Sequence, residues 1–160
     1  RNVIRDHLEY WFNGTATAPA APPLLACSPL DIVVAEDHAM SARVMELQLE
    51  KMGHRVRIAG DGLEALRLLQ AQPPDLLFLD MRMPLLDGPG VARRWRAQEP
   101  PGRPLPIIAL TANVTLEHRA LCIEAGMDDF LAKPIAPDTL RALLERFGSP
   151  SKNHSTAQPP

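Results

Sequence analysis

The sequence predicts an open, doubly wound α/β fold built on a five-stranded parallel sheet, and three observations support this. Strand-like and helix-like patterns alternate five times between about Leu30 and Phe147, as repeated βα units do. Most of the strand-like runs are continuously apolar, which is typical of strands buried on both faces of a parallel sheet. Each connection is long enough for a crossover helix, and such crossovers are right-handed.

The predicted strands are short apolar segments with a turn or a helical pattern on either side. They are Leu30–Ala35, Arg55–Ala59, Asp75–Asp80, Leu105–Leu110 and Asp129–Ala132. The predicted helices follow them in order: His38–Lys51, a helix starting at Gly62, Gly88–Ala97, Asn113–Glu124 and Pro137–Phe147.

Several helix ends carry recognisable local signals. Asp61 and Glu64 have the spacing of a capping box at the start of the second helix. Gly126 is a typical C-terminal stop, and Pro137 is suited to the first turn of a helix. In the third helix we expect the basic residues to lie on a solvated face; these are Arg93, Arg94 and Arg96.

The composition indicates one domain with flanking segments. The chain has 160 residues and a formal net charge of −2, which argues against a nucleic-acid-binding surface. We predict an N-terminal segment with a Pro/Ala-rich linker at 1–28, a domain at 29–148 and a disordered tail at 149–160.

The location is predicted from cysteine usage and hydropathy. The two cysteines do not form a disulfide framework, so we expect a reducing, cytoplasmic compartment. No apolar run has the roughly 18 residues of a membrane span, so we expect no direct membrane contact by this chain. The chain begins at Arg1, and we expect it to be a piece of a longer protein. A membrane anchor elsewhere in that longer protein remains an open alternative.

Polar side chains stand at the ends of four predicted strands. They are Glu36 and Asp37, Asp80, Thr111, and Lys133. In an open α/β sheet the functional crevice lies at the carboxyl ends of the strands. Carboxylates, a hydroxyl and an ammonium that converge there are suited to a hard divalent cation and a phosphoryl group.

Each residue type predicts a role. An aspartate carboxylate such as Asp80 is a nucleophile toward phosphorus, and Lys133 is placed to neutralise charge on a transferring phosphoryl group. Asp37 and Asp80 are expected to bind Mg²⁺ (or Mn²⁺) directly, with Glu36 acting through water. Thr111 offers a hydroxyl to a phosphoryl oxygen. The competing interpretation is that Asp37 and Asp80 only cap helices or turns.

These residues occur within sequence strings that resemble a known family. IVVAED, LLFLDMRMPLLDG, PIIALTA and GMDDFLAKP are similar to the receiver domain of two-component response regulators and bacterial hybrid sensor histidine kinases, in the same order and spacing. The resemblance covers Leu30 to Phe147 and implies a flavodoxin-like (βα)5 fold.

The resemblance also implies roles for the site residues. Asp80 would be the phosphoacceptor, Glu36 and Asp37 the acidic pair, Thr111 the switch hydroxyl and Lys133 the conserved-type lysine of the family. The backbone carbonyl of Arg82 would complete the metal sphere, and Lys133–Pro134 would be a cis peptide.

Phe130 stands where the family places its second switch residue, often an aromatic one. From the residues alone, a switch role and simple core packing remain equal alternatives.

The implied function is that of a phosphorylatable switch in a phosphorelay. The expected partners are the phosphohistidine domain of a histidine kinase, a histidine phosphotransfer domain docking on the first helix, and a second copy in a weak homodimer. The favoured parent is a hybrid kinase in the inner membrane, with this domain on the cytoplasmic side. Self-phosphorylation and autodephosphorylation are the only catalysis expected of the chain itself.

Three alternatives remain at this point. One is the receiver of a separate response regulator whose output domain is missing. Another is a receiver-like interaction module that is never phosphorylated. The third, a phosphohydrolase of the haloacid-dehalogenase type, is disfavoured because that family needs a second aspartate two residues after the nucleophile, where this chain has Arg82.

Overall fold

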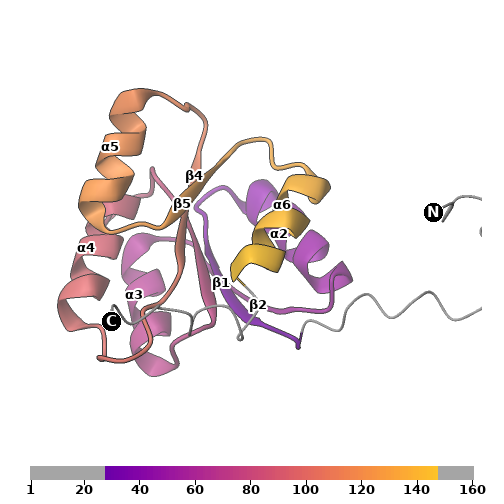
Figure 1. Ribbon diagram of the computed structural model, residues 1–160, viewed down its shortest axis with the longest axis horizontal. Coiled ribbons are helices and arrows are strands. Elements are labelled where there is room, and N and C mark those ends of the chain that lie inside the picture. The colour runs from indigo at the N-terminus through magenta and orange to yellow at the C-terminus, as the bar shows by residue number, and fades with distance from the viewer. Residues whose placement is uncertain (1–27, 148–160) are drawn as a thin grey trace, which may run out of the picture.

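The computed structural model describes residues 28–147, shown in Figure 1. Almost all of the predicted linker and the whole predicted tail lie outside the described residues, so the domain boundaries at 29 and 148 stay predictions. The elements, in chain order, are β1 (Asp31–Ala35), α2 (Ala39–Lys51), β2 (Arg55–Ala59), α3 (Gly62–Ala71), β3 (Leu76–Asp80), α4 (Gly88–Gln98), β4 (Ile107–Thr111), α5 (Leu116–Ala125), β5 (Asp129–Ala132) and α6 (Pro137–Phe147).

The five strands form one parallel sheet in the order β2-β1-β3-β4-β5. This confirms the predicted fold class. The chain adds β2 on one side of β1 and then crosses back to add β3 on the other side. The connections that leave β1 and β3 therefore diverge, and they open a crevice outside the carboxyl ends of these two strands.

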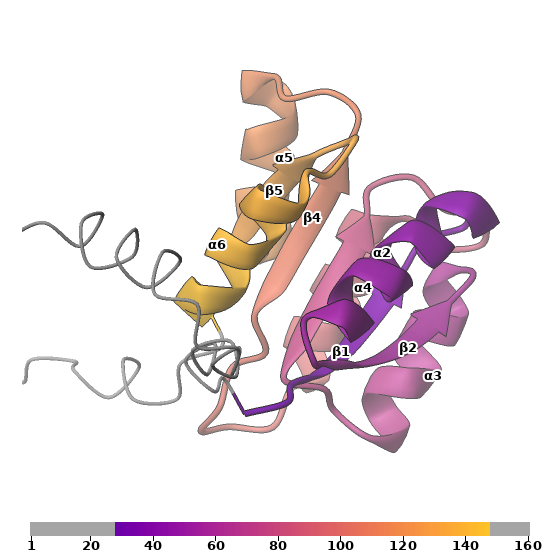
Figure 2. The same ribbon diagram turned by 90° about the vertical axis from the view of Figure 1, so that its right-hand side faces the viewer.

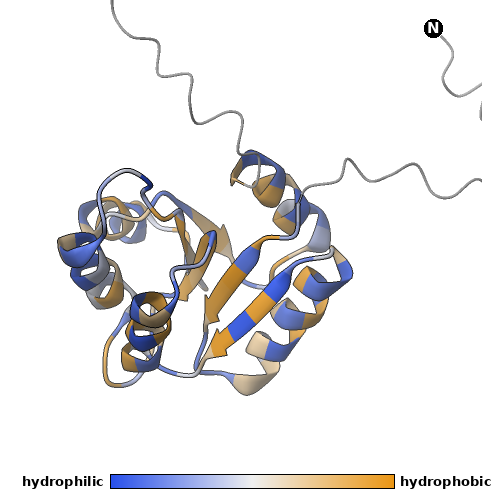
Figure 3. Ribbon diagram, turned by 90° about the horizontal axis from the view of Figure 1, so that it is seen from below, coloured by the Kyte–Doolittle hydropathy of each residue, from blue (hydrophilic) through white to orange (hydrophobic). Residues whose placement is uncertain are grey.

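Helices cover both faces of the sheet (Figure 2). Buried side chains of α3, α4 and α5 pack on one face, in a core that includes Leu69 and Trp95. Those of α2 and α6 pack on the other, around Leu49 and Leu140. Every residue of β3 and β4 is buried. In Figure 3 the strands are largely hydrophobic, with one strand of alternating hydrophilic and hydrophobic residues, and the helices carry both kinds of residue.

Local signals set several helix ends as predicted. The backbone N–H of Glu64 donates to Asp61 Oδ1 over 2.8 Å, and the Glu64 carboxylate accepts from the Gly60 N–H over 2.7 Å. Gly126 ends α5 with a φ of 89°, a left-handed conformation that favours glycine. The sequence pattern is therefore sufficient to predict a helix cap when the two partners are only a few residues apart.

Two expectations about helices are wrong. α5 begins at Leu116 and not at Asn113, because the Thr115 side chain is the N-cap and accepts from the His118 N–H. Arg96 does not lie on a solvated face: its guanidinium binds Glu99, Asp128 and the Gly126 carbonyl at 2.6, 3.0 and 2.9 Å. Glu99 is only three residues away, but the helical repeat cannot reveal Asp128 and Gly126, which come from a distant part of the chain.

Within residues 28–147, no helix combines the length and the apolar character that a membrane crossing requires.

Candidate functional site

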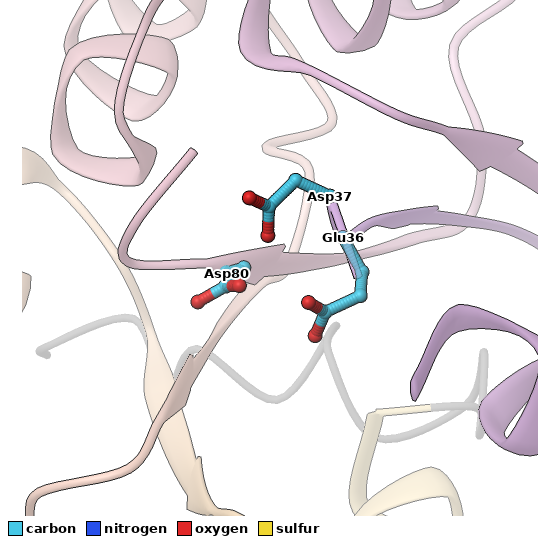
Figure 4. Close-up of side chains that lie close together, drawn as sticks. All are labelled: Glu36, Asp37 and Asp80. Carbon is cyan, nitrogen blue, oxygen red and sulfur yellow. The ribbon is translucent and has the colours of Figure 1, made fainter. Parts of the chain in front are cut away.

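Three carboxylates meet at the carboxyl ends of β1 and β3 (Figure 4). Glu36 directly follows β1 and its backbone N–H donates to the Ala59 carbonyl over 3.0 Å, which extends the strand pairing by one residue. Asp80 is the last residue of β3, and both Glu36 and Asp80 are buried, whereas Asp37 is exposed. One oxygen atom from each carboxylate lies within 4.8 Å of the other two.

His38, and not Asp37, caps the helix that follows. The imidazole Nδ1 of His38 accepts from the Ser41 N–H over 3.4 Å. The alternative of Asp37 as the cap of α2 is therefore wrong, and its carboxylate is left to the acidic cluster.

Lys133 brings a positive charge to this cluster from the end of β5. Its Nζ lies 2.6 Å from Glu36 Oε2 and 3.0 Å from Asp80 Oδ2. The Lys133 backbone N–H donates to the Thr111 carbonyl over 2.8 Å, which anchors the residue beside β4. The Lys133–Pro134 peptide is cis, as the family resemblance implied.

Burial and charge shape the protonation of the cluster. Burial raises the pKa of Glu36, and the neighbouring Asp80 raises it further, while the Lys133 ammonium opposes the change. Burial also lowers the pKa of Lys133, but its hydrogen bonds to Glu36 and Asp80 outweigh burial and raise the pKa above its usual value. Lys133 therefore remains cationic, and the carboxylates outnumber it.

The donor set fits a hard divalent cation. Magnesium prefers carboxylate and water oxygens in octahedral geometry, and Glu36, Asp37 and Asp80 supply carboxylate oxygens close together. Arg82 lies beside the cluster, with its N–H donating to Asp80 Oδ1 over 3.2 Å. The predicted role of the Arg82 carbonyl as a further ligand stays a prediction.

Glycine allows the chain to turn tightly beside Asp80. A Cβ atom on Gly88 would lie 2.3 Å from the Asp80 carbonyl oxygen, far inside contact distance. The Gly88 N–H donates to the Met81 carbonyl, and Asp87 caps α4 by accepting from the Gly90 N–H. Asp87 and Gly88 thus hold the loop after β3 close to the strand end.

Thr111 is the last residue of β4 and is buried at the same crevice. Its hydroxyl donates to the Asn113 carbonyl over 2.8 Å and accepts from the Asn113 N–H over 3.1 Å. In this structure the hydroxyl is therefore engaged with its own loop. Phe130, in β5, is half-buried and packs against the core beneath α3, α4 and α5.

All five predicted polar residues line one cleft of about 390 Å³, together with His118 from α5. The sequence pattern does not single out His118, which shows no metal-ligand spacing with the other histidines. Its Nδ1 lies 2.7 Å from Thr115 Oγ1, so the helix cap turns the imidazole toward the loop after β4. Only the tertiary placement of α5, which packs against α4 and β5, brings it to the cleft.

Comparison with known proteins identifies the family. Residues 32–145 match the response regulator receiver domain. The chain belongs to this family. The receiver domain is 38% identical over 122 residues to the hybrid signal transduction protein dokA of Dictyostelium discoideum, a match that covers 76% of this chain and 7% of that protein. Over 116 residues it is 35% identical to the sensor histidine kinase RcsC of Escherichia coli K12, covering 72% of this chain and 12% of RcsC.

Other similar proteins include a transcriptional regulator and a receiver domain of known structure. The probable transcriptional regulator ycf27 of Cyanophora paradoxa is 38% identical over 124 residues, covering 75% of this chain and 50% of that protein. Among solved structures, the receiver domain of sensor histidine kinase PA1611 from Pseudomonas aeruginosa is 41% identical, with a TM-score of 0.70 over 76% of this chain and all of that one. That structure has a magnesium ion coordinated in its active site cleft. The receiver domain thus spans between 7% and 50% of the length of these curated relatives.

Proposed function

We propose that this receiver domain takes a phosphoryl group from a phosphohistidine onto Asp80 and changes conformation in response. The observation that carries the proposal is the contact of Lys133 Nζ with both Glu36 and Asp80 at the mouth of the acidic cluster. Structural carboxylates do not need to be crowded in this way, and the crowding is costly unless a cation or a phosphoryl group uses it.

In this reaction an Asp80 carboxylate oxygen attacks phosphorus in line with the leaving imidazole. The P–O bond forms as the P–N bond breaks, and the imidazole leaves with the electron pair of the P–N bond. Lys133 stabilises the negative charge on the phosphoryl oxygens, so that catalysis consists mostly of positioning and electrostatics. Glu36, Asp37 and Asp80 would hold Mg²⁺, which offsets the phosphoryl charge when bound.

Phosphorylation would be sensed by Thr111. To donate a hydrogen bond to a phosphoryl oxygen, its hydroxyl must give up the Asn113 carbonyl that it binds in this structure. This exchange pulls on the loop before α5 and vacates space next to Phe130. A local change in charge would then bias a two-state element, α5 with its preceding loop.

The phosphohistidine partner has a suitable docking surface on α2. Met40 and Val44 are 68% and 47% exposed, although most large apolar side chains of the domain are buried. Together with Pro134 and Ile135 they line a groove of about 220 Å³ that also touches Glu36 and Lys133. An apolar helical partner such as a kinase or histidine phosphotransfer domain would place its phosphohistidine over the cleft from here.

We further propose that the parent protein is a hybrid sensor histidine kinase with this domain on the cytoplasmic side. The similarity to the receivers of RcsC and PA1611 supports this assignment. The similarity to ycf27 supports the alternative of a separate regulator. Sequencing the gene around this segment decides between them: a kinase core before it supports the hybrid, and an output domain after it supports the regulator.

The phosphoacceptor role is tested by intact-mass analysis after incubation with acetyl phosphate, with and without Mg²⁺. Wild type should gain one phosphoryl group only with Mg²⁺, and Asp80→Asn should gain none. Asp138→Asn, on the exposed surface of α6, is the matched control and should behave as wild type.

A folded wild type that gains no phosphoryl group is then titrated with beryllofluoride and Mg²⁺. Binding would mean a working site with rapid hydrolysis. Failure to bind would refute the proposal and favour an interaction module that is never phosphorylated.

A further inference from the structure

Helix α5 buries few of its side chains against the rest of the domain. Its buried residues are only Cys122 and Ala125, and its outer face exposes Leu116 by 82% and Ile123 by 74%. Elements with little buried apolar surface have the lowest local stability and are the ones that move. Contacts between α5 and β5 therefore have a large influence on where this helix lies.

One such contact joins Arg119 of α5 to Phe130 of β5. The guanidinium carbon of Arg119 lies over the Phe130 ring, 5.2 Å from its centroid, which is the geometry of a cation–π interaction. Among the described residues Arg119 has no acidic side chain within ion-pair distance, in contrast to Arg96 and Arg146. The aromatic ring is thus the partner that the structure provides for this charge.

The Phe130 ring is half-buried and packs at the edge of the core beneath α3, α4 and α5, so an inward movement needs space to open beside it. Its neighbour on β4 is Ala109, a small residue, and Thr111 lies two residues further along the same strand. In this structure the Thr111 hydroxyl donates a hydrogen bond to the Asn113 carbonyl. An inward movement of the ring would take it away from the exposed Arg119 side chain and lose the cation–π contact.

We propose that Arg119 is a positioning residue that holds Phe130 in its outer position and thereby favours the unphosphorylated state of the receiver. This inference rests on the proposed function, since it needs Thr111 and Phe130 to move on phosphorylation. It adds a residue of α5 that sets how readily they do so. An exposed cation–π contact changes an equilibrium by about two- to fivefold.

The test is the affinity for beryllofluoride at fixed Mg²⁺, measured by calorimetry on the full chain. Arg119→Gln should bind about two- to fivefold more tightly than wild type, because the bound state no longer has to break the contact. Arg94→Gln, an exposed arginine of α4, is the control for loss of charge and should bind as wild type. In a Phe130→Leu background Arg119→Gln should have no effect, because the ring is already absent.

A second readout separates positioning from general stability. The ring resonances of Phe130 in metal-free protein should shift in Arg119→Gln and not in Arg94→Gln. If Arg119→Gln binds beryllofluoride as wild type does, or tightens binding equally in the Phe130→Leu background, the inference is wrong while the proposed function stands. If wild type binds no beryllofluoride, both are overturned.

Discussion

Removal of the Lys133 charge should destabilise the metal-free domain, and the size of the effect can be worked out from the site. Lys133→Met keeps an unbranched apolar side chain but leaves the Glu36 and Asp80 side chains, 1% and 9% exposed, without their counter-ion. Loss of one partner from a buried ion pair costs about 3–5 kcal/mol. Because the Lys133 side chain is itself 26% exposed, we expect the lower part of this range, about 3 kcal/mol.

The assay is urea unfolding without divalent cations at mildly alkaline pH. With a slope of about 2 kcal/mol per molar urea, the unfolding midpoint should fall by about 1.5 M. Lys51→Met, in the exposed last turn of α2, is the matched control; it should lose less than about 1 kcal/mol. Adding Glu36→Gln to Lys133→Met should recover part of the loss, because it removes the more deeply buried of the two carboxylate charges.

The pH dependence has a definite sign. The pKa of Glu36 is raised above 4.5 in the folded domain, and removal of Lys133 must raise it further. Between 4.5 and that raised pKa the folded state binds more protons than the unfolded state, so this group makes stability fall as the pH rises. The difference between Lys133→Met and wild type should therefore shrink as the pH approaches 4.5. A loss below about 1 kcal/mol, or one independent of pH, would refute the reasoning.

Three further predictions concern residues around the core. Gly88→Ala should lower the free energy of unfolding by about 2 kcal/mol in urea titrations, because the added Cβ would lie 2.3 Å from the Asp80 carbonyl oxygen; an unchanged stability would mean that the loop adjusts freely. Burial raises the pKa of the Cys122 thiol, so in a Cys27→Ser background its alkylation should be about a hundredfold slower in the native protein than in urea; equal rates would contradict this. Burial lowers the pKa of His54 below 6.5, so the unfolded state binds more protons and stability should fall as the pH drops below 6.5, a slope that His54→Gln should reduce.

The sequence was sufficient for features that depend on a few neighbouring residues. Continuous apolar runs predicted the buried strands β1, β3 and β4, since a strand covered on both faces has no polar side. The expectation was wrong for the edge strands β2 and β5, which are only partly buried because each has a neighbour on one side only. The contact of Asp61 with Glu64 was predictable because the partners are one helical turn apart. The polar strand ends predicted a single site because parallel strands direct their carboxyl ends to one edge of the sheet.

Tertiary structure alone decided which residues touch across the chain. Lys133 and Asp80 are separated by 53 positions, and only the pairing of β5 with β4 and of β4 with β3 brings the ammonium to the carboxylates. The apolar pattern of α2 did not distinguish the exposed Met40 from the buried Met45, because buried and exposed apolar residues share one helical repeat. The contact of Arg119 with Phe130 likewise has no signature in the sequence. Local chemistry specifies elements and their ends, whereas contacts between distant side chains depend on how the helices pack against the sheet.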